Sequence, residues 1–217
     1  MATIDLTTFS GEVDLMEIRL NILAPHVDLF IVGEAELTFS GHAKRLEYME
    51  HAHRWSQFAH KIVYVPITSY YDPQTLAYLT MQCEENMAYA HRMAFYQKEH
   101  LQRALIGHSE TDTIYWGDCD EIWTPQQVTD EPARLEQLQY CNHLNRRSSE
   151  PWKGTIVAPY SKVKQWGLNQ IRLKSKRILP NGGYHFTNLG GYGAVLKKVQ
   201  SYDHQEVNTP QYLEKLK

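Results

Sequence analysis

The chain has 217 residues, of which 42% are hydrophobic, and its formal net charge is −3 at pH 7. This length and apolar fraction suffice for one sizeable core, so the sequence predicts a single domain. The small negative charge excludes the strongly basic surface typical of proteins that bind nucleic acid or membrane surfaces. No stretch approaches the roughly 20 apolar residues needed to cross a bilayer.

The cysteines and the first residues of the chain bear on the cellular compartment. Cys83, Cys119 and Cys141 fit neither a disulfide framework nor the spacing of a zinc site, so we expect reduced thiols. The first residues lack the basic region and the long apolar run of a signal peptide. Together these features predict a cytoplasmic protein, in a bacterium or in the host of a virus.

The first half of the chain alternates strand and helix signals. Strands are predicted at residues 3–9, 28–32, 61–66 and 113–116, and helices at residues 12–23 and 84–106. The two middle strands are continuous apolar runs, which are typical of a parallel sheet covered on both faces. The polar segment 34–59 is predicted as loop and short helix over the sheet edge. The alternation favours an α/β fold with a mainly parallel central sheet flanked by helices.

The second half changes character. Strands are predicted at residues 138–144 and 154–160, a short helix at 161–167, and a basic strand or extended segment at 171–178. Asn181-Gly182-Gly183 indicates a turn before a further β-rich segment, and Gly190-Gly191 precedes a helix predicted at 194–199. Here we expect the sheet to become mixed and to supply the rest of the site.

Two carboxylates follow the predicted strand 113–116. If the chain stays extended beyond Gly117, Asp118 and Asp120 point the same way, because strand residues alternate faces. Carboxylates on one face repel each other unless something positive lies between them, and a hard cation such as Mg²⁺ or Mn²⁺ is the usual solution. Ligands also bind at the carboxyl ends of strands in α/β sheets. Ile122 and Pro125 further predict that a helix starts after the carboxylates.

Several segments together resemble glycosyltransferase family 17, the family of the bisecting N-acetylglucosaminyltransferase. They keep the family's order and extend over nearly the whole chain. The matching segments are residues 9–20, 32–34 with 37–41, Gly117-Asp118-Cys119-Asp120-Glu121-Ile122, Gly182-Gly183-Tyr184-His185-Phe186, and Ser201-Tyr202-Asp203-His204-Gln205-Glu206.

The resemblance implies a GT-A fold in a single domain, residues 1–217. Residues 1–121 would form the nucleotide-sugar-binding half and residues 122–217 the acceptor-side half. Family members invert the anomeric centre in one displacement, typically with a uridine-diphosphate (UDP) sugar and a hydroxyl acceptor. Mn²⁺ or Mg²⁺ held by Asp118 and Asp120 would stabilise the charge on the departing diphosphate. His185 is the expected third metal ligand, and His204 is the alternative metal or phosphate contact.

The same resemblance gives candidates for the donor and acceptor sites. Beside Asp118, the candidates for donor contacts are Phe9, Ser10, Arg19, Glu34 and Arg92. Arg19 could instead form a helix-surface ion pair with Glu12 or Asp14, and Lys98 is a further phosphate or sugar candidate. Trp152 and Glu150 are candidates for the acceptor side, because aromatic faces pack on pyranose rings. The basic run 172–177 fits a solvated strand face better than the diphosphate side.

The general base is the weakest point of the resemblance. Inversion needs a base, normally a carboxylate, to take the proton of the acceptor hydroxyl. Glu206 ranks first and Glu121 second, because both lie in family-like segments. Many relatives carry an acidic residue near the start of the helix after the double glycine, where this chain has Tyr192-Gly193-Ala194.

Two other functions remain open from sequence alone. One is a metal-dependent nucleotidyltransferase or phosphohydrolase that uses the same carboxylates, and the other is an inactive nucleotide-sugar-binding module. For the transferase, a glycan, polysaccharide or lipid-linked acceptor is expected. Modified DNA is a less favoured acceptor, because the chain lacks a basic field.

Overall fold

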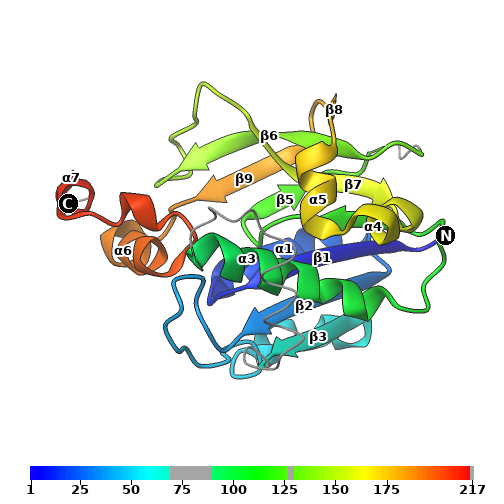
Figure 1. The fold of residues 1–217 in the computed structure, drawn as a ribbon, viewed down its shortest axis with the longest axis horizontal. Helices are drawn as coiled ribbons and strands as arrows, with labels where there is room; N and C mark the ends of the chain where they lie inside the picture. The colour runs from blue at the N-terminus through cyan, green and yellow to red at the C-terminus, as the bar shows by residue number, and fades with distance from the viewer. Residues whose placement is uncertain (69–88, 127–129, 216–217) are drawn as a thin grey trace.

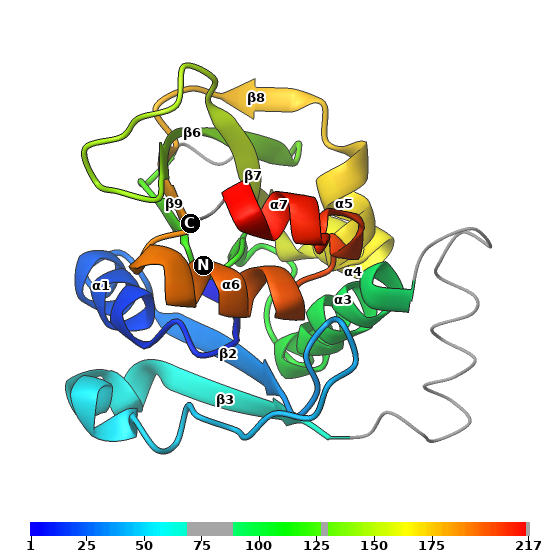
Figure 2. The same cartoon turned by 90° about the vertical axis from the view of Figure 1, so that its left-hand side faces the viewer.

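The computed structural model describes residues 1–68, 89–126 and 130–215, and shows a central sheet with helices on both faces (Figure 1). Within the described residues the sheet has nine strands, in the order β3-β2-β1-β4-β7-β6-β9-β5, with β8 paired to β6. Figure 2 shows α1 on one side of the sheet and α3, α4 and α5 on the other. The expected α/β class is therefore confirmed.

The first four strands are parallel. They are β1 (Thr3–Phe9), β2 (Leu29–Ala35), β3 (Ile62–Ile67) and β4 (Thr113–Trp116). Ile4 and Leu6 of β1 face a cluster with Leu101, whereas Phe9 faces the opposite cluster with Met16. This alternation explains the continuous apolar runs, because both faces of a buried parallel sheet need apolar side chains.

Helices fill both covering layers. On one face lie α1 (Val13–Leu23) and the 3₁₀ helix η1 (Ala52–Lys61). On the other face lie α3 (Tyr89–His100), the 3₁₀ helix η2 (Leu101–Leu105), α4 (Tyr160–Trp166) and α5 (Leu168–Lys174). The carboxyl ends of β1, β2 and β4 meet at one edge of the sheet. That edge is where an α/β fold binds ligands.

The second half makes the sheet mixed, as predicted. Strand β7 (Trp152–Pro159) runs antiparallel to β4, and β6 (Ala133–Cys141) runs antiparallel to β7. Strand β9 (Gly183–Thr187) is parallel to β6 and antiparallel to the short β5 (Glu121–Trp123), while β8 (Arg177–Leu179) is parallel to β6. After β9 come α6 (Gly191–Ser201), the 3₁₀ turn η3 (Gln205–Val207) and α7 (Pro210–Lys215).

Three sequence predictions are corrected here. Among the described residues 121–126 no helix begins, because residues 121–123 form β5 and pair with β9. The predicted basic strand 171–178 is α5 followed by β8, because Leu168 and Ile171 are buried at helical spacing. The strand predicted at 138–144 begins earlier, at Ala133, and ends at Cys141, before Asn142 adopts a φ of 65°.

The long helix predicted at 84–106 is an α-helix only in part. It is helical as α3 up to His100 and continues as the 3₁₀ helix η2, while residues 84–88 lie outside the described residues. Cys83 also lies outside them, and Cys119 and Cys141 are free thiols. In the described ranges, every helix is too short or too polar to span a membrane.

Candidate active site

The chain turns directly after β4 and does not stay extended. The backbone N–H of Glu121 donates to the carbonyl oxygen of Asp118 over 2.9 Å, which closes a turn across residues 118–121. The argument from strand alternation is therefore wrong for Asp118 and Asp120. The turn nevertheless leaves both carboxylates at the carboxyl edge of the parallel strands, where the sequence predicted them.

Arg19, on α1, supports this turn through hydrogen bonds to its backbone. Its guanidinium forms a two-bond pair with Asp5 of β1, at 2.6 and 2.9 Å, and both side chains are fully buried. Its remaining nitrogen donates to the carbonyl oxygens of Asp118 and Glu121, at 3.2 and 2.6 Å. The alternative surface ion pair of Arg19 with Glu12 or Asp14 is wrong, because Arg19 is buried and pairs with Asp5. Its donor contact stays a prediction.

Asp118 lies between two cations from different elements. Lys98 Nζ, on α3, is 2.9 Å from Asp118 Oδ1, and Arg172 Nη1, on α5, is 3.1 Å from Oδ2. Burial acts to raise the pKa of Asp118, but Lys98 and Arg172 outweigh it and hold that pKa well below its usual range. Asp118 is therefore ionised at neutral pH.

Asp120 has cations of its own. Lys198 Nζ, on α6, is 2.9 Å from Asp120 Oδ2, and His185 Nε2, on β9, is 3.6 Å from Oδ1. Burial again acts to raise the pKa of the carboxyl, and Lys198 and His185 together bring it well below its usual range. Asp120 itself helps to raise the pKa of the Lys198 ammonium, against burial.

Glu121 positions Arg172. Its carboxylate is fully buried, and Oε1 accepts from Arg172 Nη2 at 2.6 Å and from Trp152 Nε1 at 2.7 Å. Oε2 accepts from the Thr155 hydroxyl at 2.9 Å. Because both carboxylate oxygens are bonded inside the protein, the geometry gives Glu121 a supporting position, and its second-ranked base role stays a prediction.

The donor set suits a hard divalent cation by its chemistry. Asp118 and Asp120 offer carboxylate oxygens and His185 an imidazole nitrogen, which are ligands that Mn²⁺ accepts. In the described residues, however, the ligand atoms of these three side chains do not gather within 4.8 Å of one another. Lysine and arginine nitrogens supply the positive charge in this arrangement.

We call the turn at residues 118–121 the acidic turn. Cationic side chains surround it at the carboxyl edge of the parallel strands, and this arrangement is consistent with a known family. Residues 2–216 match the family model described as Glycosyltransferase family 17. The chain belongs to glycosyltransferase family 17. It is therefore a glycosyltransferase. No curated protein matches the chain.

The candidate site draws on both predicted halves of the chain. Lys98 and the acidic turn lie in residues 1–121, whereas Arg172, His185 and Lys198 lie in residues 122–217. Lys98 was a candidate from sequence. Lys198 was missed, and no local pattern distinguishes it from its neighbour Lys197. Arg172 was assigned to a solvated strand because the helical spacing of Leu168 and Ile171 was not recognised.

Two predicted donor contacts are structural in this glycosyltransferase. Phe9 is 2% exposed and packs edge-on against Tyr48 and Trp55. Glu34 is 1% exposed, and its oxygens accept bonds from Lys44, from Tyr64 and from the backbone of residues 47 and 48. Burial and these partners give both side chains a structural role, and their donor contacts stay predictions.

The other predicted residues are dispersed. Ser10 is exposed at the end of β1, and its N–H donates to Glu12 over 2.6 Å. Arg92 is half-buried on α3. Trp152 stacks on His185 with ring centroids 4.6 Å apart, so it supports the metal candidate. Glu150 is exposed in the loop before β7.

His204 and Glu206 lie together after α6. His204 Nδ1 is 2.7 Å from Glu206 Oε1, and both side chains are more than half exposed. None of the contacts described among residues 89–126 and 130–215 joins either side chain to Asp118 or Asp120. The base role of Glu206 therefore stays a prediction.

Proposed function

We propose that this glycosyltransferase uses a GT-A architecture to transfer a sugar, with inversion, from a nucleotide-diphosphate donor to a hydroxyl group. A UDP-sugar is the expected donor. The observation that carries the proposal is the ring of Lys98, Arg172 and Lys198 around Asp118 and Asp120. Support also comes from its place at the carboxyl ends of β1 and β4, where α/β folds bind nucleotides.

In this proposal the diphosphate of the donor occupies the cationic ring. Breaking the sugar–phosphate bond leaves negative charge on the departing diphosphate. Cationic hydrogen-bonding groups that Asp118, Asp120 and Glu121 already orient would stabilise that charge with little reorganisation. Lys98, Arg172 and Lys198 would therefore donate to phosphate oxygens more strongly in the transition state than in the ground state.

A divalent cation remains part of the proposal. Mn²⁺ or Mg²⁺ would be held by Asp118 and Asp120, with His185 as a third ligand, and would supply Lewis acidity at the departing diphosphate. To bind the ion, Asp118 and Asp120 would exchange their contacts with Lys98 and Lys198 for contacts with the metal. The lysines would then be released toward the phosphate oxygens.

For the acceptor, we propose that the 122–217 half binds a glycan, polysaccharide or lipid-linked hydroxyl, in the cytoplasm. Glu206 is the base candidate whose carboxylate is open to solvent, and its own backbone N–H and His204 hold its pKa below the usual range. The base role of Glu206 stays a prediction. Glu206→Gln would lower kcat and leave the donor Kd unchanged if it holds.

The proposal is tested by calorimetry of UDP-sugars with the whole chain, in Mn²⁺ and in EDTA. We expect donor binding in Mn²⁺, weaker binding in EDTA, and loss of the metal effect in Asp120→Asn. Equal donor affinity in Mn²⁺ and EDTA would instead assign the diphosphate to the lysines and arginine alone.

Product analysis separates this function from its rivals. Glycosyl transfer releases free nucleoside diphosphate and a glycoside, whereas a nucleotidyltransferase or phosphohydrolase releases pyrophosphate or monophosphate. Membership of family 17 favours the first outcome. An inactive binding module would bind the donor without releasing nucleoside diphosphate when acceptors are supplied.

A further inference from the structure

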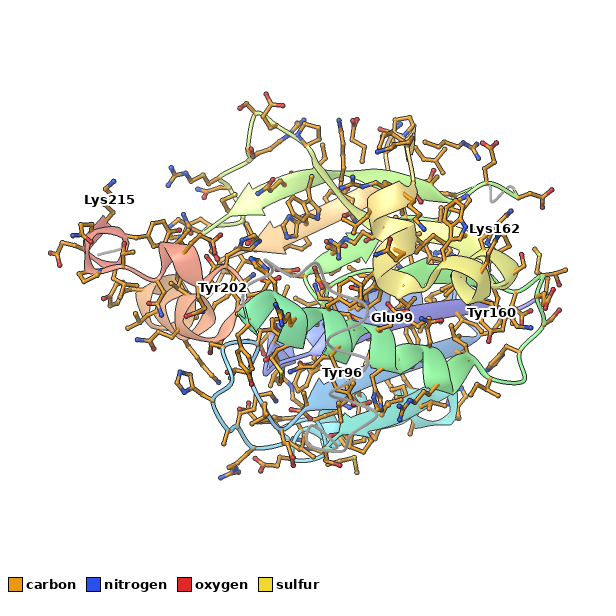
Figure 3. The ribbon with its side chains drawn as sticks, in the orientation of Figure 1. Tyr96, Glu99, Tyr160, Lys162, Tyr202 and Lys215 are labelled. Carbon is orange, nitrogen blue, oxygen red and sulfur yellow. The ribbon has the colours of Figure 1, made fainter. Side chains whose placement is uncertain are left out.

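A second group of possible metal ligands lies outside the acidic turn. His91, on α3, and His204 and Glu206, after α6, place one ligand atom each so that all three atoms lie within 4.8 Å of one another. The two imidazole rings meet edge to face, with centroids 5.0 Å apart. Figure 3 shows the end of α6, marked by Tyr202, beside α3. Two segments far apart in sequence thus converge on one point.

The surroundings of the group orient its histidines. Asp203 Oδ2 lies 3.6 Å from Nδ1 of His91, which leaves Nε2 of His91 for a ligand. Metal-bound histidines usually present their other ring nitrogen to a carboxylate in this way. The side chains of His91 and Asp203 are 30% and 25% exposed, so the pair is partly shielded from solvent.

We propose that His91, His204 and Glu206 bind a transition-metal ion of the Zn²⁺ class, with a fourth position open to water. Two imidazoles and a carboxylate are a common zinc donor set, and imidazole favours Zn²⁺ over Mg²⁺. A tetrahedral ion with bonds of about 2.0–2.1 Å needs ligand atoms about 3.3 Å apart. Rotation of partly exposed side chains brings atoms within 4.8 Å to that spacing.

The ion would fasten α3 to α6. Gln205, between the two ligands of the second segment, donates from Nε2 to the carbonyl oxygens of Val199 and Tyr202, at 3.0 and 2.7 Å. The segment is therefore anchored to the end of α6, the helix that carries Lys198. On α3, Lys98 follows His91 by about two turns, on the same face. The site would thus fix two helices that supply cations to the acidic turn.

The test is Zn²⁺ binding to the whole chain without any nucleotide. In thermal unfolding, free Zn²⁺ at 100 times its Kd would raise Tm by about 5–10 °C. Co²⁺ in place of Zn²⁺ would give the visible absorption of a tetrahedral nitrogen–oxygen site. His91→Ala and His204→Ala would each lower Zn²⁺ affinity by about 100-fold or more, since loss of outer-shell partners alone costs about 10–100-fold.

Matched variants make the result specific. His60→Ala removes an exposed histidine from η1 and would leave Zn²⁺ affinity unchanged. In an Asp120→Asn background, which removes a ligand of the proposed catalytic metal, His91→Ala would still lower Zn²⁺ affinity. Unchanged Zn²⁺ affinity in both His91→Ala and His204→Ala, with a native far-ultraviolet spectrum, overturns the proposal. That outcome leaves the proposed transferase function intact, because donor binding is measured separately.

This site gives Glu206 a role other than the predicted base. Glu206→Ala weakens Zn²⁺ binding without donor or acceptor present if the carboxylate is a ligand. Unchanged Zn²⁺ affinity in this variant removes Glu206 from the site.

Discussion

Single side chains decide what the acidic turn can do. Asp118 and Asp120 stay ionised because Lys98, Arg172 and Lys198 lie within 3.1 Å of their oxygens. Arg19 and Glu121 are fully buried, and their contacts hold the turn and Arg172 in place. The residues around the two carboxylates and the residues that support them thus differ in burial, although all are charged.

At this scale Lys198 can be compared with its neighbour Lys197. Lys198→Ala removes a charge-assisted contact to Asp120 and, in our proposal, to the diphosphate, so we expect donor affinity to fall by about 10- to 100-fold. The Lys197 side chain is 67% exposed and lies near Glu47, so Lys197→Ala is the matched control. Calorimetry with a UDP-sugar measures both, and equal affinities would remove Lys198 from the donor site.

Arg19 gives a prediction for stability. Arg19→Ala leaves Asp5 fully buried, with Trp123 Nε1 as its remaining side-chain hydrogen-bond donor among the described residues, so we expect a loss of about 3–5 kcal/mol in the free energy of unfolding. The control is Arg45→Ala, which breaks an exposed ion pair with Glu50 and should leave the urea midpoint unchanged. Similar midpoints for the two variants would contradict the buried-support role.

Among the elements, α5 depends on a neighbouring helix. Glu99 of α3 accepts the N–H groups of Leu168 and Asn169, at 3.0 and 2.9 Å, and so caps the first turn of α5 (Figure 3). These N–H groups have no partner within their own helix. The cap fixes the helix that carries Arg172, which links α3 packing to the charge on Asp118.

Removal of that cap should affect both stability and binding. Glu99→Ala leaves buried N–H donors unsatisfied, so we expect a loss of about 1–3 kcal/mol in unfolding free energy and weaker donor binding through displaced Arg172. Glu110→Ala is the control, because Glu110 pairs with Lys164 of α4 at the surface. Urea unfolding and donor calorimetry test this prediction, and unchanged donor affinity in Glu99→Ala would show that α5 keeps Arg172 in place without the cap.

Across the whole molecule, carboxylates with lowered pKa tie distant segments together. Asp118 and Asp120 join the acidic turn to α3, α5, α6 and β9. Asp112 binds the backbone N–H groups of Ala2 and Ser109, at 2.7 and 3.0 Å, and these bonds lower its pKa against burial. The same contacts that shape the site therefore contribute to global stability.

This predicts acid sensitivity. The pKa of each of these three carboxyls is lower folded than unfolded, so the unfolded chain binds more protons as pH falls. The stabilisation is fully present above the unfolded pKa, near 3.8, and is lost as pH falls below about 4. Urea midpoints between pH 7 and pH 3 measure this loss. Asp120→Asn should show a shallower fall, and an identical slope would exclude Asp120 as a contributor.

Much of the fold can be predicted from the sequence, because the spacing of apolar residues along the chain indicates which side of a strand or helix faces the core. The bounds of β1 and β4 were predicted correctly, as were the parallel first half and the mixed second half. The carboxylates at the end of β4 and the family were also recognised from local motifs. Errors in local structure arose where burial overrode composition, as in α5, whose basic residues conceal an apolar helical face.

Only the tertiary structure decided the partners of the charged residues. Whether Arg19 contacts a phosphate, a surface carboxylate or buried Asp5 depends on how α1 crosses β1, and the residue type is the same in each case. Lys198 pairs with Asp120 because α6 returns beside the acidic turn. Sequence determines local conformation through steric and apolar spacing, whereas long-range ion pairs depend on how distant segments fold together, which no local pattern encodes.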